Sequence, residues 1–201
     1  MEDDINNQLS PGDFICDLTA AVFNDTTIAF QNNGGIRSSF PVGNITYEDV
    51  LEVLPFDNTV DKVTMNGAGL KMSLENAAAS INYTDLSEYP GFGFQVAGLR
   101  FTIIVEPHNQ NSRIKDLEVL NVDGSYSDLN ETAIYNVALP SFLAGGGEKN
   151  QRQTRGIFDD GIIDHTPGDT ILFEAARNYI KDKSIIHQVR IQSSRGSLIK
   201  C

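Results

Sequence analysis

The chain has 201 residues, of which 40% are hydrophobic and 21% are charged, an ordinary composition for a globular protein. Its formal net charge of −12 argues against nonspecific binding to nucleic acid, because the phosphates would be repelled. No stretch approaches the run of about 18 apolar residues that a membrane-spanning helix requires.

The first half of the chain is predicted to alternate helices with strands, from the spacing of its apolar residues. The expected elements are a helix over 12–24, a strand over 27–31, a helix over 46–54, a strand over 59–65 and a helix over 68–81. Thr46 is the expected N-cap of the second helix, with Asp49 three residues later in a near capping box. Pro55 ends that helix, because it disfavours helical geometry at Leu54.

The second half is predicted to be richer in strands, which are separated by Pro, Gly and Asn. Its expected elements are strands over 94–105, 116–124 and 132–140, a polar region over 145–165, a helix that Thr166 caps, and a closing strand over 187–192. Pro167 fits the first turn of that helix. These elements predict an α+β (mixed α/β) fold: one domain over 12–192, in which helices flank a mixed sheet. A polar N-terminal segment, 1–11, precedes this domain and a loose tail, 193–201, follows it.

Catalytic motifs are missing from the sequence, which has no G-x-S-x-G, H-E-x-x-H or P-loop pattern. The histidines at 108, 165 and 187 stand apart from one another, and each is expected to be an ordinary surface residue. No group of Asp and His residues suggests a di-metal site. We therefore expect no catalytic residue, no metal ligand and no cofactor in this chain.

Cysteines and glycosylation sequons bear on the compartment of the protein. Cys16 fits a small buried residue of a helix, and a disulfide with Cys201 is the alternative. The N-terminus lacks the basic-then-apolar pattern of a signal peptide. Sequons mildly favour an extracellular, secreted origin, and the candidate glycosylation sites are Asn24, Asn44, Asn82 and Asn130.

Three loops have the composition of a binding site. "QNNGGIR" follows the end of a strand, where open sheets commonly bind ligands; Gly34 and Gly35 would allow close backbone approach, and Arg37 could bind a phosphate or a sugar hydroxyl. "LPFDNT" and "LPSFLAGGGE" each place a phenylalanine, Phe56 or Phe142, in a loop next to a proline. Taken alone, the first loop also fits an ordinary turn, and the phenylalanines fit either the core or two rings that face each other across a flat ligand.

Together, six stretches resemble the C-terminal domain of the 5′-nucleotidase family, which includes ecto-5′-nucleotidases, salivary apyrases and UDP-sugar hydrolases. They are "GDFICD" at 12–17, "NNGGIR" at 32–37, "ITYEDVLEVLPFDNT" at 45–59, "MNGAGLKMSLE" at 65–75, "FQVAGLRFTI" at 94–103 and "LPSFLAGGGE" at 139–148. They occur in the family's order and cover nearly the whole chain. The chain looks most like the secreted, salivary-type animal members.

The resemblance implies a domain that binds a purine nucleotide or nucleoside. In the family two phenylalanines hold the adenine, and these positions match Phe56 and Phe142. The nucleoside contacts match Asn32 and Arg37, and a further base contact of some members matches Asn58. The position that binds the ribose hydroxyls is Glu148, where the family usually has Asp, and Asn33 replaces a family glycine.

The family's second domain, an N-terminal metallophosphoesterase, holds two divalent metal ions and the catalytic residues. Its D-x-H and G-N-H-[DE] motifs are not found in this sequence. The chain is therefore expected to be the nucleotide-binding part of a 5′-nucleotidase or apyrase, a fragment whose partner is that N-terminal domain. The alternative is a stand-alone, non-catalytic secreted derivative that scavenges nucleotides or binds a host receptor.

Overall fold

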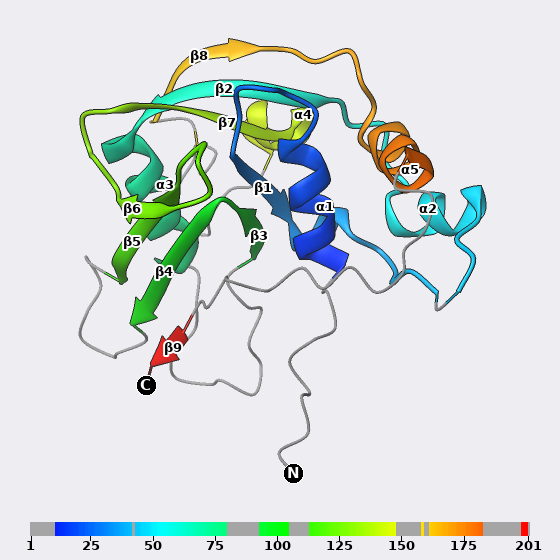
Figure 1. Cartoon of the computed structure of the whole chain (residues 1–201), viewed down its shortest axis with the longest axis horizontal. Coiled ribbons are helices and arrows are strands. Elements are labelled where there is room, and N and C mark those ends of the chain that lie inside the picture. The colour runs from blue at the N-terminus through cyan, green and yellow to red at the C-terminus, as the bar shows by residue number, and fades with distance from the viewer. Residues whose placement is uncertain are drawn as a thin grey trace.

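The computed structural model describes residues 11–41, 43–79, 93–104, 113–147, 158 and 161–182, together with the backbone of 198–200, and the strands of these residues form two mixed sheets (Figure 1). The larger sheet has the order β3-β1-β7-β2-β8 and the smaller one the order β6-β5-β4-β9. The strands of the larger sheet are β1 (Ile28–Asn32), β2 (Val60–Asn66), β3 (Phe94–Ala97), β7 (Ile134–Pro140) and β8 (Ile162–Thr166). Those of the smaller sheet are β4 (Leu99–Ile104), β5 (Ile114–Leu120), β6 (Tyr126–Asp128) and β9 (Leu198–Lys200).

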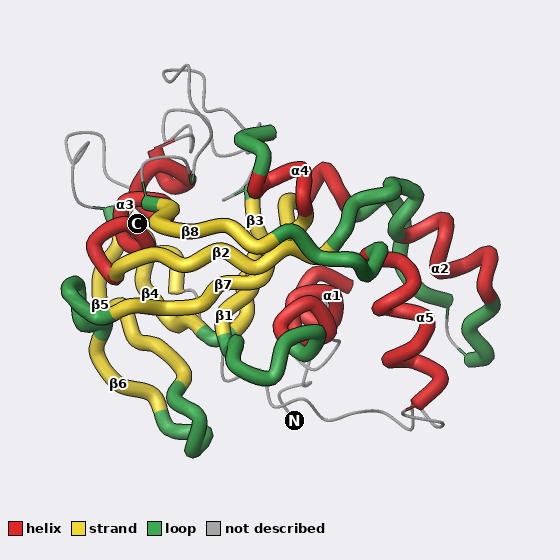
Figure 2. The backbone as a smooth tube through the Cα atoms, turned by 90° about the horizontal axis from the view of Figure 1, so that it is seen from above, coloured by secondary structure: helices red, strands yellow, loops and turns green. Residues whose placement is uncertain are grey.

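Helices lie on both sides of the larger sheet, which confirms the predicted α+β class. They are α1 (Pro11–Ala20), the short 3-10 helix η1 (Asn33–Gly35), α2 (Tyr47–Val53), α3 (Gly67–Ala79), α4 (Ser141–Ala144) and α5 (Leu172–Asp182). Helices α1, α2 and α5 are grouped together beside the sheet (Figure 2). Helix α3 belongs to the part of the molecule that contains the smaller sheet (Figure 1).

The alternation of side chains along the strands divides the core into two clusters, one on each face of the larger sheet. Ile28 and Phe30 of β1 pack with α3 and with strands β4 and β5. Ala29, which lies between them in sequence, packs with apolar residues of α1, α2 and α5. Strand β7 repeats this pattern, because Ala138 belongs to the helical cluster and its neighbour Leu139 to the other. The sheet is therefore buried on both faces where these helices cover it.

Helix α2 confirms the predicted cap. The Thr46 side chain accepts a hydrogen bond from the Asp49 backbone N–H, and the Asp49 carboxylate accepts one from the Thr46 backbone N–H at 2.6 Å. These hydrogen bonds satisfy two amide groups at the helix start that have no partner within the helix. They also lower the pKa of Asp49 below its ordinary value, first through the Thr46 side chain and then through its backbone.

The predicted strand over 94–105 is wrong as a single element. It is two strands, β3 and β4, which belong to different sheets and are separated by Gly98. Gly98 has a φ of +71°, so the chain turns here and passes from the larger sheet to the smaller one. The sequence pattern does not show this break, because both strands have a buried face and apolar residues therefore recur on both sides of the turn.

The predicted start of the last helix is also wrong. Thr166 is the final residue of β8, where it pairs with Lys62 of β2, and α5 begins only at Leu172. The combination of threonine and proline has the local chemistry of a helix start, but pairing with β2 holds the threonine in a strand. The strand expected over 187–192 lies outside the described residues, and 198–200, expected to be part of a tail, form β9 parallel to β4.

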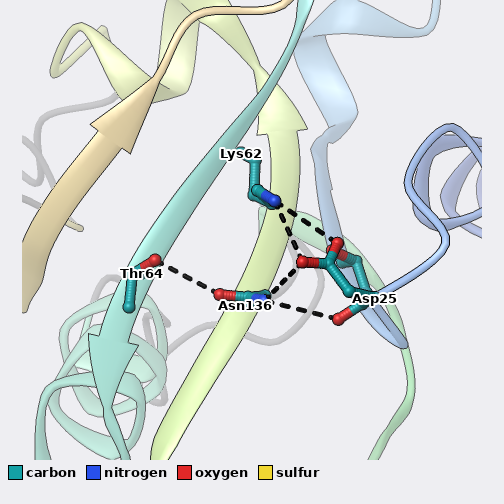
Figure 3. Close-up of polar contacts among 5 residues, drawn as sticks. Asp25, Lys62, Thr64 and Asn136 are labelled. Carbon is teal, nitrogen blue, oxygen red and sulfur yellow. Dashed lines mark hydrogen bonds and ion pairs between the residues drawn. The ribbon is translucent and has the colours of Figure 1, made fainter.

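A polar network fixes the connection between α1 and β1 to the larger sheet (Figure 3). The Lys62 ammonium lies 3.0 Å from the Asp25 carboxylate, which also accepts a hydrogen bond from the Asn136 side-chain amide at 3.0 Å. The Thr64 hydroxyl donates to the side-chain Oδ1 of Asn136 at 3.2 Å. The network therefore links this connection to both β2 and β7.

Candidate functional site

The three loops singled out in the sequence meet at one end of the larger sheet. Strands β1 and β7 are parallel, so their carboxyl ends, at Asn32 and Pro140, lie on the same side. Strand β2 is antiparallel to β7 and pairs Val60 with Pro140, so β2 begins where β1 and β7 end. The topology thus gathers the loop after β1, the loop before β2 and the loop after β7.

Hydrogen bonds between backbone groups join these loops. The Arg37 N–H donates to the Val53 carbonyl at 2.9 Å, which ties the loop after β1 to the end of α2. The Ser141 N–H donates to the Thr59 carbonyl at 2.8 Å, and the Thr59 N–H donates to the Ser141 hydroxyl oxygen at 3.1 Å. The loop before β2 is therefore fixed to the segment after β7, and the helix that precedes it, α2, is fixed to the loop after β1.

The loop after β1 is a single turn of 3-10 helix that contains both glycines. Gly35 is buried, and a Cβ there would overlap the end of the buried Gln31 side chain, so a larger residue would have to displace that amide. At Gly34 a Cβ would lie 3.6 Å from the Asn32 side-chain nitrogen, an ordinary contact. Asn33 has no positive φ, so its backbone conformation does not require the glycine that the family has at this position.

Asn32 and Arg37 flank this turn in different environments. Asn32 is buried, and its side-chain oxygen accepts a hydrogen bond from the Gln31 amide at 3.3 Å. The Arg37 side chain is exposed and folds back so that Nη1 donates to the Gly34 carbonyl at 3.2 Å. The Asn32 side chain is thus hydrogen-bonded inside the loop, and the Arg37 cation lies on the surface of the loop.

The two phenylalanines are exposed, which rules out the core interpretation. Phe56 is 46% exposed and Phe142 is 43% exposed, whereas the phenylalanines of the cores, such as Phe30, are almost fully buried. Neither ring stacks on another aromatic ring within the described part of the chain. Phe56 lies in the loop before β2 and Phe142 in the short helix α4, and two exposed rings on segments that are hydrogen-bonded to each other suit a binding surface better than a core.

The end of the third loop supports the position of one ring. The Gly147 N–H donates to the Phe142 carbonyl at 2.8 Å, and a Cβ on Gly147 would overlap the Phe142 ring. Gly147 therefore lets the chain pass directly against this ring. Glu148, the next residue, lies outside the described residues. Asn58 is half-buried, and its carbonyl accepts a hydrogen bond from the Leu172 N–H at 2.8 Å.

His165 is exposed, as expected of a surface histidine, but it is not isolated. Its Nε2 lies 2.7 Å from a carboxylate oxygen of Asp61, a residue that is 3% exposed. Neither Asp61 nor its neighbours Thr59 and Ser141 were predicted from the sequence to belong to the site. The signal available was the Thr59-x-Asp61 spacing, because residues two apart in a strand point to the same side. The histidines at 108 and 187 lie outside the described residues.

Among the residues that the structure describes, no three His, Cys, Asp or Glu side chains are grouped so that they would hold a metal ion. None of the helices in the described ranges is long and apolar enough to cross a membrane. Cys16 is buried within α1, as expected, and Cys201, its alternative disulfide partner, lies outside the described residues.

The fold and these loops define the class of protein: a mixed α/β domain with a candidate ligand-binding surface at one end of its larger sheet. The family model of the 5′-nucleotidase C-terminal domain matches residues 4–154. The chain belongs to this family, as its motifs indicate.

Individual relatives agree with this assignment. A 5′-nucleotidase of Bos taurus is 32% identical over 87% of this chain and 30% of its own length. A 5′-nucleotidase-related protein of Glossina morsitans morsitans is 40% identical over 60% of this chain and 21% of its own length. The crystal structure of a 5′-nucleotidase precursor from Thermus thermophilus superposes with a TM-score of 0.73 at 29% identity, covering 88% of this chain and 33% of that one. The chain thus spans about a third or less of the length of these relatives.

Proposed function

We propose that this domain binds a purine nucleotide or nucleoside at the end of the larger sheet, with the base between Phe56 and Phe142. The observation that carries this proposal is the exposure of both rings on loops that the paired hydrogen bonds of Thr59 and Ser141 hold together. A planar base stacks well on such rings, because every base has a flat π-face and stacking does not depend on the positions of its polar groups.

The remaining residues of the site are assigned by the family pattern together with their place in the loops. We assign Asn32, Asn58 and Glu148 to polar contacts with the nucleoside. Arg37, the exposed cation of the first loop, suits a phosphate or a ribose hydroxyl because guanidinium groups donate several hydrogen bonds in one plane. We also assign Gly34 and Gly35 to the site, where the exposed Gly34 would let a ligand approach the backbone of the turn.

Hydrolysis of the nucleotide is assigned to an N-terminal metallophosphoesterase domain of the full-length protein. That domain would hold a pair of divalent metal ions, and this domain would present the substrate to it. The proposed activity of the whole protein is that of a 5′-nucleotidase or apyrase. Binding without turnover is the expected behaviour of this chain alone.

Calorimetric titration of the chain with AMP, ADP and adenosine tests the proposal. Phe56→Ala and Phe142→Ala should each weaken adenine binding by about 1–3 kcal/mol, the range for base–aromatic stacking. Both should leave the melting temperature nearly unchanged, because each ring is almost half exposed. Tyr47→Ala is the matched control, since Tyr47 is 49% exposed but packs on Phe173 of α5, and it should retain wild-type affinity.

Three results would each contradict a part of the proposal. If no adenine compound binds even at about millimolar concentration, the interpretation as a nucleotide site fails and a receptor-binding derivative becomes the better explanation. If Tyr47→Ala weakens binding as much as the phenylalanine variants do, the loss is not specific to the proposed stack. Phosphate release by this chain alone with Mg²⁺, Zn²⁺ or Co²⁺ would refute the assignment of catalysis to another domain.

We also propose that the protein is secreted and carries N-linked glycans. Asn24, Asn44 and Asn130 are all exposed, as a glycosylated asparagine must be, and Asn82 lies outside the described residues. Expression through a eukaryotic secretory pathway should give a product whose mass falls on treatment with an N-glycosidase. An unchanged mass would contradict the glycoprotein assignment.

A further inference from the structure

Asp61 is a buried residue whose side-chain carboxyl group is contacted by three polar groups. One of its oxygens accepts from the Thr59 hydroxyl at 2.7 Å and from the Gly168 backbone N–H at 3.0 Å. The other lies 2.7 Å from Nε2 of His165. The residue is 3% exposed, so these groups replace the water that a carboxylate would otherwise bind.

The three groups that contact Asp61 belong to the segments that surround the loop of Phe56. Thr59 lies three residues after this ring, and its backbone exchanges two hydrogen bonds with Ser141, the residue directly before Phe142. Asp61 therefore contacts the same residue that joins the two aromatic loops.

The segment that contains Gly168 holds the other side of the same loop. The Val60 N–H donates to the Thr170 carbonyl at 2.9 Å, and the Leu172 N–H donates to the Asn58 carbonyl at 2.8 Å. Thr59 also forms an isolated antiparallel bridge with Ile171. Residues 58–60 thus run between Ser141 on one side and residues 168–172 on the other, and Asp61 binds to the second segment through Gly168.

We propose that Asp61 is a positioning residue that sets the gap between the rings of Phe56 and Phe142. This inference rests on the proposed function, in which one base is bound by both rings. Both carboxylate oxygens of Asp61 are already engaged by Thr59, Gly168 and His165, so Asp61 acts through Thr59. When the carboxylate is lost, Thr59 is released from one of its contacts, and the loop of Phe56 shifts relative to the loop of Phe142.

The test compares AMP and adenosine binding to the 201-residue chain and to its Asp61 variants, below the melting temperature of each variant. Asp61→Ala should raise the dissociation constant for both ligands by about tenfold, because hydrogen bonds to a charged group are among the stronger ones in proteins. Asp61→Asn should restore affinity to within about threefold of the wild type, since a carboxamide oxygen still accepts from Thr59 and Gly168. Thr59→Val, which removes only the hydroxyl, should weaken both ligands by about threefold and provides the same test if Asp61→Ala does not fold.

Glu75→Ala provides the matched control for stability. The Glu75 carboxylate of α3 accepts hydrogen bonds from the backbone N–H groups of Arg113 and Ile114, at 2.7 and 3.0 Å, and lies outside the three loops. This variant should lower the melting temperature as Asp61→Ala does but leave the affinity for AMP unchanged. A purely structural role for Asp61 would give the same result in both variants.

The outcomes separate this inference from the proposed function. If wild-type chain binds AMP and the phenylalanine variants weaken it, but Asp61→Ala and Thr59→Val keep wild-type affinity, the positioning role is overturned and the nucleotide site stands. An effect of Asp61→Ala on AMP but not on adenosine would also overturn it, because the rings contact the base that both ligands share. If wild-type chain binds neither ligand, the proposed function fails first and the positioning role fails with it.

Discussion

Ser141 and Thr59 are 82 positions apart in sequence, and two hydrogen bonds join them at the start of β2. The backbone N–H of each residue is a donor: that of Ser141 to the Thr59 carbonyl at 2.8 Å, and that of Thr59 to the Ser141 hydroxyl oxygen at 3.1 Å. The pair fixes the loop of Phe56 against the start of α4, which carries Phe142.

Ser141→Ala should destabilise the protein by about 1–2 kcal/mol, because the part-buried N–H of Thr59 loses its acceptor. It should also weaken AMP binding, since one of the two bonds between the aromatic loops is lost. Ser73→Ala is the contrasting variant: its hydroxyl donates to the Gly69 carbonyl within α3, and removal leaves no backbone donor unpaired. Chemical denaturation of both variants measures the difference, and equal destabilisation would contradict the role given to Ser141.

The successes and errors of prediction from the sequence have a physical basis. The cap at Thr46 and the glycine turn after β1 were predicted because their chemistry is local, within three or four residues. The hydrogen bonds of the Asp61 side chain were not predicted, because two of its partners, His165 and Gly168, are more than 100 positions away in sequence. The family motifs identified the loops of the site, but a single sequence does not reveal which distant residues hold those loops together.

Gly35 and Gly34 should respond differently to the same substitution. Gly35→Ala places a methyl group into the Gln31 amide and 2.9 Å from the Asn32 side-chain oxygen, and should cost about 1–3 kcal/mol through overpacking. Gly34→Ala makes only an ordinary contact and should change stability by less than about 1 kcal/mol. Neither glycine has a positive φ, so steric contact alone produces the difference. Thermal melts of both variants test this, and a more damaging Gly34→Ala would contradict the geometry of the turn.

The capping box of α2 supports the helix that leads into the loop of Phe56. Thr46→Ala removes the oxygen that accepts from the Asp49 backbone N–H and should destabilise the protein by about 1 kcal/mol. Thr46→Ser retains this oxygen and should remain close to the wild type. Denaturation midpoints of the two variants provide the comparison, and equal loss in both would show that the methyl group of Thr46 contributes the stability instead of its hydroxyl.

The contact between Asp25 and Lys62 predicts a dependence of stability on acid (Figure 3). The hydrogen bond from Lys62 lowers the pKa of Asp25 below its ordinary value of 3.8. A carboxylate whose pKa is lower in the folded state stabilises the protein above pH 3.8, and this contribution is lost as the pH falls through the folded-state pKa. Because the Asp25 side chain is 55% exposed, the contribution should stay below about 1 kcal/mol.

Asp25→Asn should therefore lower the melting temperature at neutral pH but not at a pH below the folded-state pKa. Asp128→Asn, which neutralises an exposed carboxylate of β6, makes the same change in net charge and is the control. If Asp25→Asn has the same effect at both pH values, the ion pair is not the source of the acid dependence.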